Sequence, residues 1–285
     1  MDDIPILDNH IHLKEQGSGL EGAKEFEKAG GTHMVLVNLP SWSYGISLTE
    51  PDDYRKAFQK TVSLAKKIEK NLDLDVYPVV GVHPAELTKW MEAGRSLSKT
   101  IKLMKEGLRI ARKFVEENKA VAIGEIGRPH YSVDPKIMNR SMQIFKFALE
   151  QAKIAGCPVQ VHMDKLNSEN IKDLKDLVEE VGIEEKKVIK HFAEPAEMDL
   201  KEFNYTASVT ARKQNINKLD LCSKKPFMFE TDYLDDPNRP GAVLGPKTVP
   251  RRFKWLLNQD KIDKSKIIEI NKKLPEKIYN ISIEL

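Results

Sequence analysis

Six of the seven histidines follow short apolar segments whose composition predicts β-strands. Those at or just past the carboxyl ends of such segments are His10, His12, His83, His130, His162 and His191. Only His33 lies at the beginning of one. In a barrel of alternating strands and helices, the carboxyl ends of the strands meet at the face where active sites form. Neutral imidazoles can bind divalent cations there, so the histidines predict a metal site at this face.

His10 and His12 are two residues apart in an extended segment, so their side chains point to the same side. Two imidazoles placed in this way can bind one cation. An isolated His-x-His motif is more often a buried, hydrogen-bonded pair, because short motifs recur by chance. The other polar residues that end predicted strands favour the metal-ligand interpretation.

Two carboxylates join the histidines at the ends of apolar segments. Glu125 lies in a Gly-Glu-Ile-Gly sequence, and burying its charge is costly unless it is paired or metal-bound. Its two oxygens could bridge two cations, and a salt bridge with Arg128 is the alternative. Asp232 ends the last apolar segment and suits a metal ligand or a general base, whereas a helix cap or turn residue is the alternative. His162 and His191 each close a segment of their own.

The elements that must position these side chains alternate along the chain. Apolar segments typical of buried parallel strands occupy residues 4–8, 34–39, 76–82, 120–126, 158–163, 187–192, 205–210 and 227–232. Amphipathic helices are predicted at 22–29, 52–70, 98–117, 136–155 and 168–181, with further helices near 249–258 and 264–273. Eight alternations indicate an α/β fold, a (β/α)8 TIM barrel, as a single domain over residues 1–285. We expect the last helices, at about 247–285, to pack on the barrel.

A doubly wound open sheet is the alternative fold, but it would need a glycine-rich turn after the first strand, where residues 9–12 stand instead. The composition is that of an ordinary globular protein, with 40% hydrophobic and 31% charged residues. A net charge of +3 gives little bias towards an anionic partner. No secretory signal and no membrane-spanning segment is evident, and Cys157 and Cys222 do not form a close pair. The expected location is the cytoplasm.

Together, six short sequences resemble those of the TatD family of metal-dependent hydrolases, within the amidohydrolase superfamily. The matching sequences, in the order of the family, are Asp8-Asn9-His10-Ile11-His12, Gly81-Val82-His83-Pro84, Gly124-Glu125-Ile126-Gly127, Val161-His162, His191-Phe192 and Glu230-Thr231-Asp232. The chain departs from the family pattern at Arg128-Pro129-His130, at Lys14, and after Asp232, where the usual proline is absent. These departures indicate a divergent, TatD-related branch with different substrate loops.

The resemblance implies two divalent metal ions, with Zn²⁺, Mn²⁺ and Mg²⁺ all left open. It places His10 and His12 on the first ion with Asp232, His162 and His191 on the second, and Glu125 between them. Glu125 and Asp232 are the predicted catalytic residues, with Asp232 accepting a proton from the attacking water. The residues expected to contact substrate are His83, Arg128, His130, Lys165 and Arg212.

The reaction that the resemblance implies is phosphodiester hydrolysis, as in a deoxyribonuclease or exonuclease, with nucleic acid or another phosphodiester as substrate. Hydrolysis of an amide, ester or lactone in a small molecule is the alternative. A bridging carboxylate in place of the carboxylated lysine common in small-molecule amidohydrolases favours the phosphodiesterase. A non-catalytic barrel that is only stabilised by its metals is a third interpretation, which the candidate base Asp232 disfavours. The sequence leaves the oligomeric state open.

Overall fold

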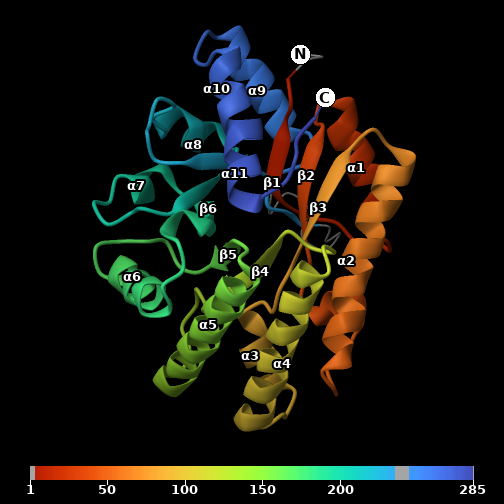
Figure 1. Ribbon diagram of the computed structural model, residues 1–285, viewed down its shortest axis with the longest axis vertical. Coiled ribbons are helices and arrows are strands. Elements are labelled where there is room, and N and C mark those ends of the chain that lie inside the picture. Colours follow the sequence, from red (N-terminus) through yellow and green to blue (C-terminus); the bar gives the residue numbers. More distant parts are fainter. Residues whose placement is uncertain (1–3, 235–243, 285) are drawn as a thin grey trace.

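The computed structural model describes residues 4–234 and 244–284. One sheet of parallel strands runs through it in the order β8-β7-β6-β5-β4-β3-β2-β1-β9 (Figure 1). The strands are β1 Leu7–His12, β2 His33–Val37, β3 Asp75–Val80, β4 Ala122–Gly127, β5 Val159–His162, β6 Val188–Ala193, β7 Thr206–Thr210, β8 Phe227–Glu230 and β9 Tyr233–Leu234. The predicted α/β fold with eight principal parallel strands is confirmed.

The sheet is curled, because its two end strands are consecutive in the sequence. Only Thr231 and Asp232 separate β8 from β9, and β9 pairs with β1. The backbone N–H of Asp232 donates to the carbonyl oxygen of His10 at 3.0 Å, so the chain leaving β8 lies against β1. Within the described residues the ladder ends at β8 and β9, without the β1–β8 ladder of a fully closed barrel. The structure therefore shows a curled parallel sheet, a coarser result than the predicted (β/α)8 closure.

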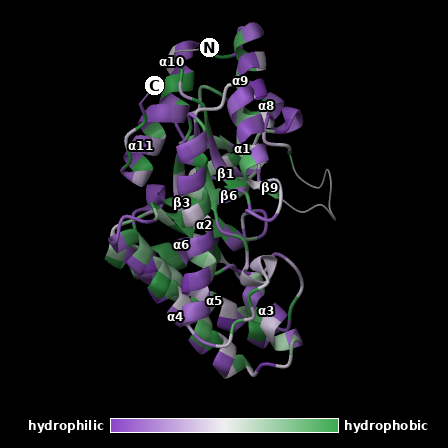
Figure 2. Cartoon of the chain, turned by 90° about the vertical axis from the view of Figure 1, so that its right-hand side faces the viewer, coloured by the Kyte–Doolittle hydropathy of each residue, from purple (hydrophilic) through white to green (hydrophobic). Residues whose placement is uncertain are grey.

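Helices cover the outer face of this sheet, and the five predicted amphipathic helices are present. They are α1 Gly19–Lys28, α2 Asp52–Asn71, α4 Leu97–Glu116, α5 Pro135–Ala155 and α6 Asn170–Val181. In α2 the buried residues recur every three or four positions, at Phe58, Val62, Ala65 and Ile68, which is the spacing of one helical face. Figure 2 shows hydrophobic residues on the strands and hydrophilic ones on the outward helix faces. No helix in the described ranges is both long and apolar enough to cross a bilayer.

Shorter elements complete the chain: α3 Ala85–Glu92, α7 Pro195–Met198, α8 Lys213–Lys218, α9 Thr248–Asn258, α10 Lys264–Ile268, the π-helix η3 Glu269–Lys273, α11 Leu274–Tyr279, and the 3₁₀ turns η1 Ser41–Tyr44 and η2 Glu185–Lys187. The last helices lie together at one end of the molecule, next to β1 (Figure 1). Asn271 Oδ1 accepts the N–H of Leu7 at 2.9 Å, and the Tyr279 hydroxyl donates to Asn9 Oδ1 at 2.8 Å. These bonds attach the carboxyl-terminal helices to β1.

The first strand is displaced from its predicted position. The apolar pattern predicted residues 4–8, but β1 is Leu7–His12, so His10 and His12 lie within the strand rather than after it. All six residues of β1 are buried, including four polar ones. Because buried polar residues interrupt the apolar run, hydrophobicity marks the segment before the strand instead of the strand itself.

Candidate metal centre

The six predicted metal ligands converge at the carboxyl ends of the strands. They come from β1, β4, β5 and β6 and from the residue pair that follows β8. Their ligand atoms form overlapping groups in which every donor lies within 4.8 Å of the others. These groups are His10, His191 and Asp232; His10, His12 and Glu125; and His83, Glu125 and His162. We call the seven residues the metal cluster.

His10 and His12 present adjacent nitrogen donors. Their Nε2 atoms are 3.0 Å apart, close to the spacing of about 3.4 Å expected for two nitrogens bound to one tetrahedral zinc ion. Asp232 Oδ1 lies 3.9 Å from His10 Nε2 and 3.7 Å from His12 Nε2. The backbone bond between Asp232 and His10 holds this carboxylate over β1. Two imidazoles and one carboxylate can therefore share a cation.

Glu125 occupies the middle of the cluster, and its two oxygens face different neighbours. Oε2 lies 3.4 Å from His12 Nε2, whereas Oε1 lies 3.0 Å from His162 Nδ1 and 3.3 Å from His191 Nε2. This arrangement fits a carboxylate that bridges two cations. The close approach of β4 to β5 requires glycine at position 127, where φ is +142° and an added Cβ would lie 1.9 Å from the carbonyl oxygen of His162.

Hydrogen bonds behind the rings orient the imidazoles. His12 Nδ1 lies 3.0 Å from the carbonyl oxygen of Val37, and a carbonyl can only accept, so this nitrogen carries the proton. His191 Nδ1 lies 3.0 Å from a carboxylate oxygen of Glu230, which places its proton in the same way. Both Nε2 atoms are left with a lone pair directed into the cluster. Imidazoles with such a partner behind them are the usual form of histidine metal ligands.

Burial keeps these imidazoles neutral. It lowers the pKa of His10 to about 3 and the pKa of His191 well below the usual range. For Glu125, burial favours the neutral acid, but electrostatic attraction to the imidazoles of His83, His191 and His10 and a hydrogen bond to His162 hold its pKa well below the usual range. Neutral imidazoles around an ionised carboxylate are the protonation states that bind divalent cations. The residues present therefore fit the metals that the fold family uses.

His83 and His130 both lie against the ring of His162. His83 Nε2 is 3.9 Å from Glu125 Oε1, and burial lowers the pKa of His83 to about 3. His130 Nδ1 lies 2.8 Å from His162 Nε2, the nitrogen directed away from Glu125. One group of donors brings His162 together with His83 and Glu125, and His162 Nδ1 and His191 Nε2 both face Glu125 Oε1. Both residues were predicted as substrate contacts, and both lie beside the predicted metal ligand His162.

The three predicted cationic contacts are already engaged. Arg128 is largely buried, and its guanidinium forms ion pairs with Asp164 and, at 2.9 Å, with Asp173. This pairing also replaces the alternative salt bridge between Arg128 and Glu125. Lys165 is paired with Glu194 at 2.5 Å. The guanidinium carbon of Arg212 lies 5.6 Å from the ring centroid of Phe192, so its charge stacks on an aromatic ring.

Two carboxylates behind the ligands received no role from the sequence. Glu230 accepts the N–H of Phe192 at 2.9 Å and the hydroxyl of Ser208, besides facing His191. Burial and the charge of Asp232 raise the pKa of Glu230 well above its usual range. Asp8 accepts both the N–H and the hydroxyl of Thr231, and burial raises its pKa to about 7. A carboxylate within an apolar segment is the sequence feature that could have identified them, and the same feature identified Glu125.

A parallel α/β sheet with imidazoles and carboxylates gathered at its carboxyl edge is an arrangement that can hold divalent metal ions. Residues 7–280 match the family described as TatD related DNase, so the chain belongs to the TatD family. The predicted resemblance is confirmed over nearly the whole chain.

Relatives support this assignment. An uncharacterized protein of Methanocaldococcus jannaschii is 34% identical, over 99% of this chain and 98% of its own length. The solved structure of the TatD homologue YjjV from Escherichia coli K12 has a TM-score of 0.66 at 20% identity, covering 97% of this chain and 98% of its own. A TatD-like protein of Archaeoglobus fulgidus has a TM-score of 0.65 at 15% identity, covering 96% of this chain and 100% of its own. At these identities the two solved structures establish the shared fold.

Proposed function

We propose that the chain is a divalent-metal-dependent phosphodiesterase that cleaves nucleic acid or a related phosphodiester, as a TatD-type deoxyribonuclease or exonuclease does. The observation that carries this proposal is the position of Glu125, whose two oxygens face two separate groups of imidazoles. The family description, TatD related DNase, supports the choice of a phosphodiester bond.

Each residue of the cluster has a role in this proposal. His10, His12 and Asp232 would hold one cation beside Glu125 Oε2, and His162 and His191, with His83 nearby, would hold the other beside Oε1. Two such cations, when bound, lower the pKa of a water molecule and stabilise negative charge on the attacked phosphate. Four to five imidazoles favour Zn²⁺ or Mn²⁺ over Mg²⁺ by ligand softness.

We assign to Asp232 the role of taking the proton of the attacking water. Its side chain is 19% exposed, whereas that of Glu125 is only 5% exposed, so a water molecule reaches the Asp232 carboxylate more readily. The carboxylate oxygen accepts the proton as the water oxygen bonds to phosphorus. The bond between phosphorus and the leaving ester oxygen breaks, and that oxygen takes up a proton and departs as a hydroxyl, which leaves a phosphate monoester. His130 holds the Nε2 side of His162 and thereby sets the direction of its Nδ1. We further propose that the fold is a closed (β/α)8 barrel, because β1 and β8 lie side by side next to this site.

A substrate panel tests the proposal. The full chain is loaded with Mn²⁺, Zn²⁺ or Mg²⁺ and assayed on DNA and RNA oligonucleotides, bis(p-nitrophenyl) phosphate, p-nitrophenyl acetate and a lactone. We expect phosphodiester cleavage that falls by at least about a hundredfold in Glu125→Gln. The matched control Asp53→Asn removes a buried carboxylate far along the chain on α2 and should retain activity per folded molecule.

Each alternative predicts a different outcome. Turnover of only the ester or lactone would replace the phosphodiesterase with a small-molecule hydrolase that uses the same cluster. If no substrate turns over with any of the three metals bound, the non-catalytic interpretation would stand, and Glu125→Gln would then affect only metal binding.

A further inference from the structure

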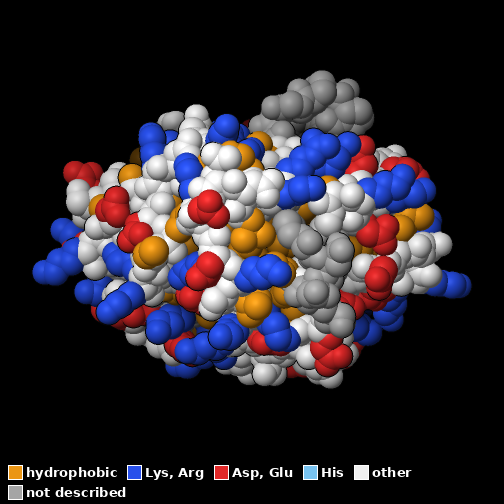
Figure 3. Space-filling view, turned by 90° about the horizontal axis from the view of Figure 1, so that it is seen from above, with side chains coloured by type: hydrophobic (Ala, Val, Ile, Leu, Met, Phe, Trp, Pro, Cys, Tyr) orange, Lys and Arg blue, Asp and Glu red, His pale blue; other side chains and the backbone are white. Residues whose placement is uncertain are grey.

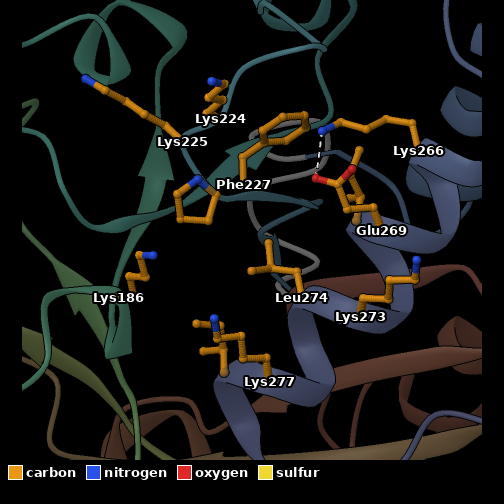
Figure 4. A pocket seen from close by; sticks show the side chains of 12 residues that line it. Lys186, Lys224, Lys225, Phe227, Lys266, Glu269, Lys273, Leu274 and Lys277 are labelled. Carbon is orange, nitrogen blue, oxygen red and sulfur yellow. Dashed lines mark hydrogen bonds and ion pairs between the residues drawn. The ribbon is translucent and has the colours of Figure 1, made fainter.

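A lysine-rich pocket lies at the opposite edge of the sheet from the metal cluster. It has a volume of about 240 Å³ and is formed by the residues that precede β6 and β8 and by α10, η3 and α11. The cationic residues that line it are Lys186, Lys224, Lys225, Lys266, Lys273 and Lys277, and Glu269 is the single carboxylate among the lining residues. We call it the lysine pocket; Figure 4 shows it from close by.

Two of these lysines already have partners. Lys266 Nζ donates to Glu269 at 2.8 Å, so the single carboxylate of the pocket is neutralised (Figure 4). Lys225 points away from Phe227 and donates to the carbonyl oxygens of Met198, at 2.6 Å, and Leu200, at 2.8 Å (Figure 4).

The other four lysines carry uncompensated charge. Lys186, Lys224, Lys273 and Lys277 are exposed and form no hydrogen bond or ion pair through their side chains with any residue that the structure describes. They come from three separate segments of the chain. Lys273 and Lys277 are four residues apart across the η3–α11 junction, a spacing at which like charges repel each other. An anion bound between them would relieve this repulsion.

The walls of the pocket are apolar and firmly packed. Phe227 is buried, and Lys266 Nζ lies 5.7 Å from its ring centroid. Buried Ile278 and half-buried Leu274 bring α11 against the same space. Figure 3 shows apolar side chains among charged ones in the middle of the face that carries α10. A concave, low-dielectric wall strengthens the potential of the lysines around it.

We propose that the lysine pocket binds a small anion that carries two or more phosphate groups, such as pyrophosphate or a nucleoside diphosphate. Four unpaired ammonium groups on three segments carry more positive charge than one phosphate group, of about −2, neutralises. Ammonium groups bind phosphate oxygens through strong, charge-assisted hydrogen bonds. A volume of about 240 Å³ lies a little below the roughly 300–1,000 Å³ of typical ligand pockets, so it suits a small ligand or the phosphate groups of a larger one. The same groups on a 5′-phosphorylated nucleic-acid end are a second source of this chemistry.

The lysine pocket is independent of the proposed phosphodiesterase. Lys186 and Lys224 precede β6 and β8, whereas His191 and Asp232 lie at the opposite ends of the same strands. The four residues of β8 alone span about 13 Å. One ligand of this size therefore cannot occupy both sites.

Isothermal titration of the full chain tests the proposal. The probes are pyrophosphate, ADP and a 5′-phosphorylated oligonucleotide, titrated into metal-loaded and chelator-treated protein at about 50 and 200 mM salt. Binding that survives chelation cannot arise from cations in the metal cluster. We expect saturable binding that weakens with salt and falls at least about tenfold in Lys273→Gln/Lys277→Gln. The matched control Lys99→Gln/Lys102→Gln removes the same charge from exposed positions on α4 and should change affinity less than about twofold.

The outcomes are distinct. Tighter binding of ADP or pyrophosphate than of the oligonucleotide assigns the pocket to a free phosphate ester, and the reverse order assigns it to a strand end. Equal losses in the pocket and control variants would show nonspecific attraction and overturn the proposal. Binding that disappears on chelation, or no saturation at millimolar probe, would overturn it as well. The mutated lysines are exposed, and thermal unfolding verifies that both variants are folded.

Discussion

Replacing Glu230 with glutamine separates the stability of the fold from the metal affinity of the cluster. Glu230 lies behind His191 and contacts its Nδ1 at 3.0 Å, while the Phe192 N–H and the Ser208 hydroxyl donate to its oxygens. A glutamine keeps the size of the side chain and one carbonyl oxygen that can accept from His191 and Phe192. The substitution therefore removes the titratable carboxyl group behind the imidazole, and with it the charge that this group carries when ionised, with little change of packing.

The two expected effects have opposite signs. Losing the carboxylate partner of a ligating histidine costs about 10–100-fold in metal affinity, which corresponds to about 1.4–2.7 kcal/mol. Stability of the metal-free protein should increase. Because burial and Asp232 raise the pKa of Glu230 above its unfolded value of 4.5, the native acid binds more protons than the unfolded one. Wild-type stability therefore falls as pH rises from about 4.5 towards the native pKa, and Glu230→Gln lacks this loss.

Two measurements check this prediction. Urea denaturation of the chelator-treated protein at about pH 5 and pH 8 should show a stability advantage of Glu230→Gln that is larger at pH 8. Competition of the protein with a chelator for Mn²⁺ or Zn²⁺ should show the loss of affinity. Glu86→Gln is the matched control, because Glu86 is equally buried but contacts Ser41 and Trp90 rather than an imidazole. An unchanged metal affinity in Glu230→Gln, or the same loss in Glu86→Gln, would refute the role of Glu230.

Contacts outside the cluster predict three other outcomes. Arg128→Met should lower the free energy of unfolding by about 1–3 kcal/mol in urea denaturation. Lys165→Met, at an exposed ion pair, should change it little. A raised KM in Arg128→Met at unchanged stability would contradict this structural role and support the predicted phosphate contact. Asp53→Ala should cost about 1–2 kcal/mol near neutral pH. Burial opposes ionisation of Asp53, but hydrogen bonds from Thr49, Lys56 and Glu50 hold its pKa well below 3.8. The stabilisation by Asp53 is therefore present above that pH and lost below it. An equal cost of Asp53→Ala in thermal unfolding at pH 7 and at about pH 3 would argue against this pH dependence. Burial raises the pKa of Cys157 to about 12, so a thiol reagent should label exposed Cys222 alone in the native protein and both thiols in urea. Rapid labelling of both cysteines in the native protein would contradict this prediction.

The predictable part of the fold is the part that apolar periodicity controls. Long helices such as α2 and α5 were predicted to within a residue or two at each end, because many turns repeat the same buried face. The eight-residue helix α3 and the six-residue α11 were not predicted, since two turns or fewer give little periodicity. The two-residue strand β9 carries no pattern at all, yet it pairs with β1 and brings the two ends of the sheet together.

The candidate site was predictable in its composition but not in its pairings. The residue types and strand-end positions of His10, Glu125 and Asp232 were enough to predict a cluster, because parallel strands bring their carboxyl ends together. Which nitrogen of His162 faces Glu125 depends on the ring orientation, which His130 influences from a loop 32 residues earlier. Likewise, the sequence predicts that Arg128 is a cation near the metal site, and only the structure shows that two carboxylates form ion pairs with it.

Where β1 meets the chain that leaves β8, the same residues stabilise the fold and position the metal cluster. Asp8 accepts two hydrogen bonds from Thr231, and the Asp232 N–H donates to the carbonyl oxygen of His10. These polar contacts hold the first strand against the residues after the eighth, and they also fix the positions of three predicted ligands. Such contacts require buried polar side chains in β1, and these interrupt the apolar pattern by which a buried strand is predicted. The strand that contributes most to the cluster is therefore the one whose position apolar patterning predicted least well.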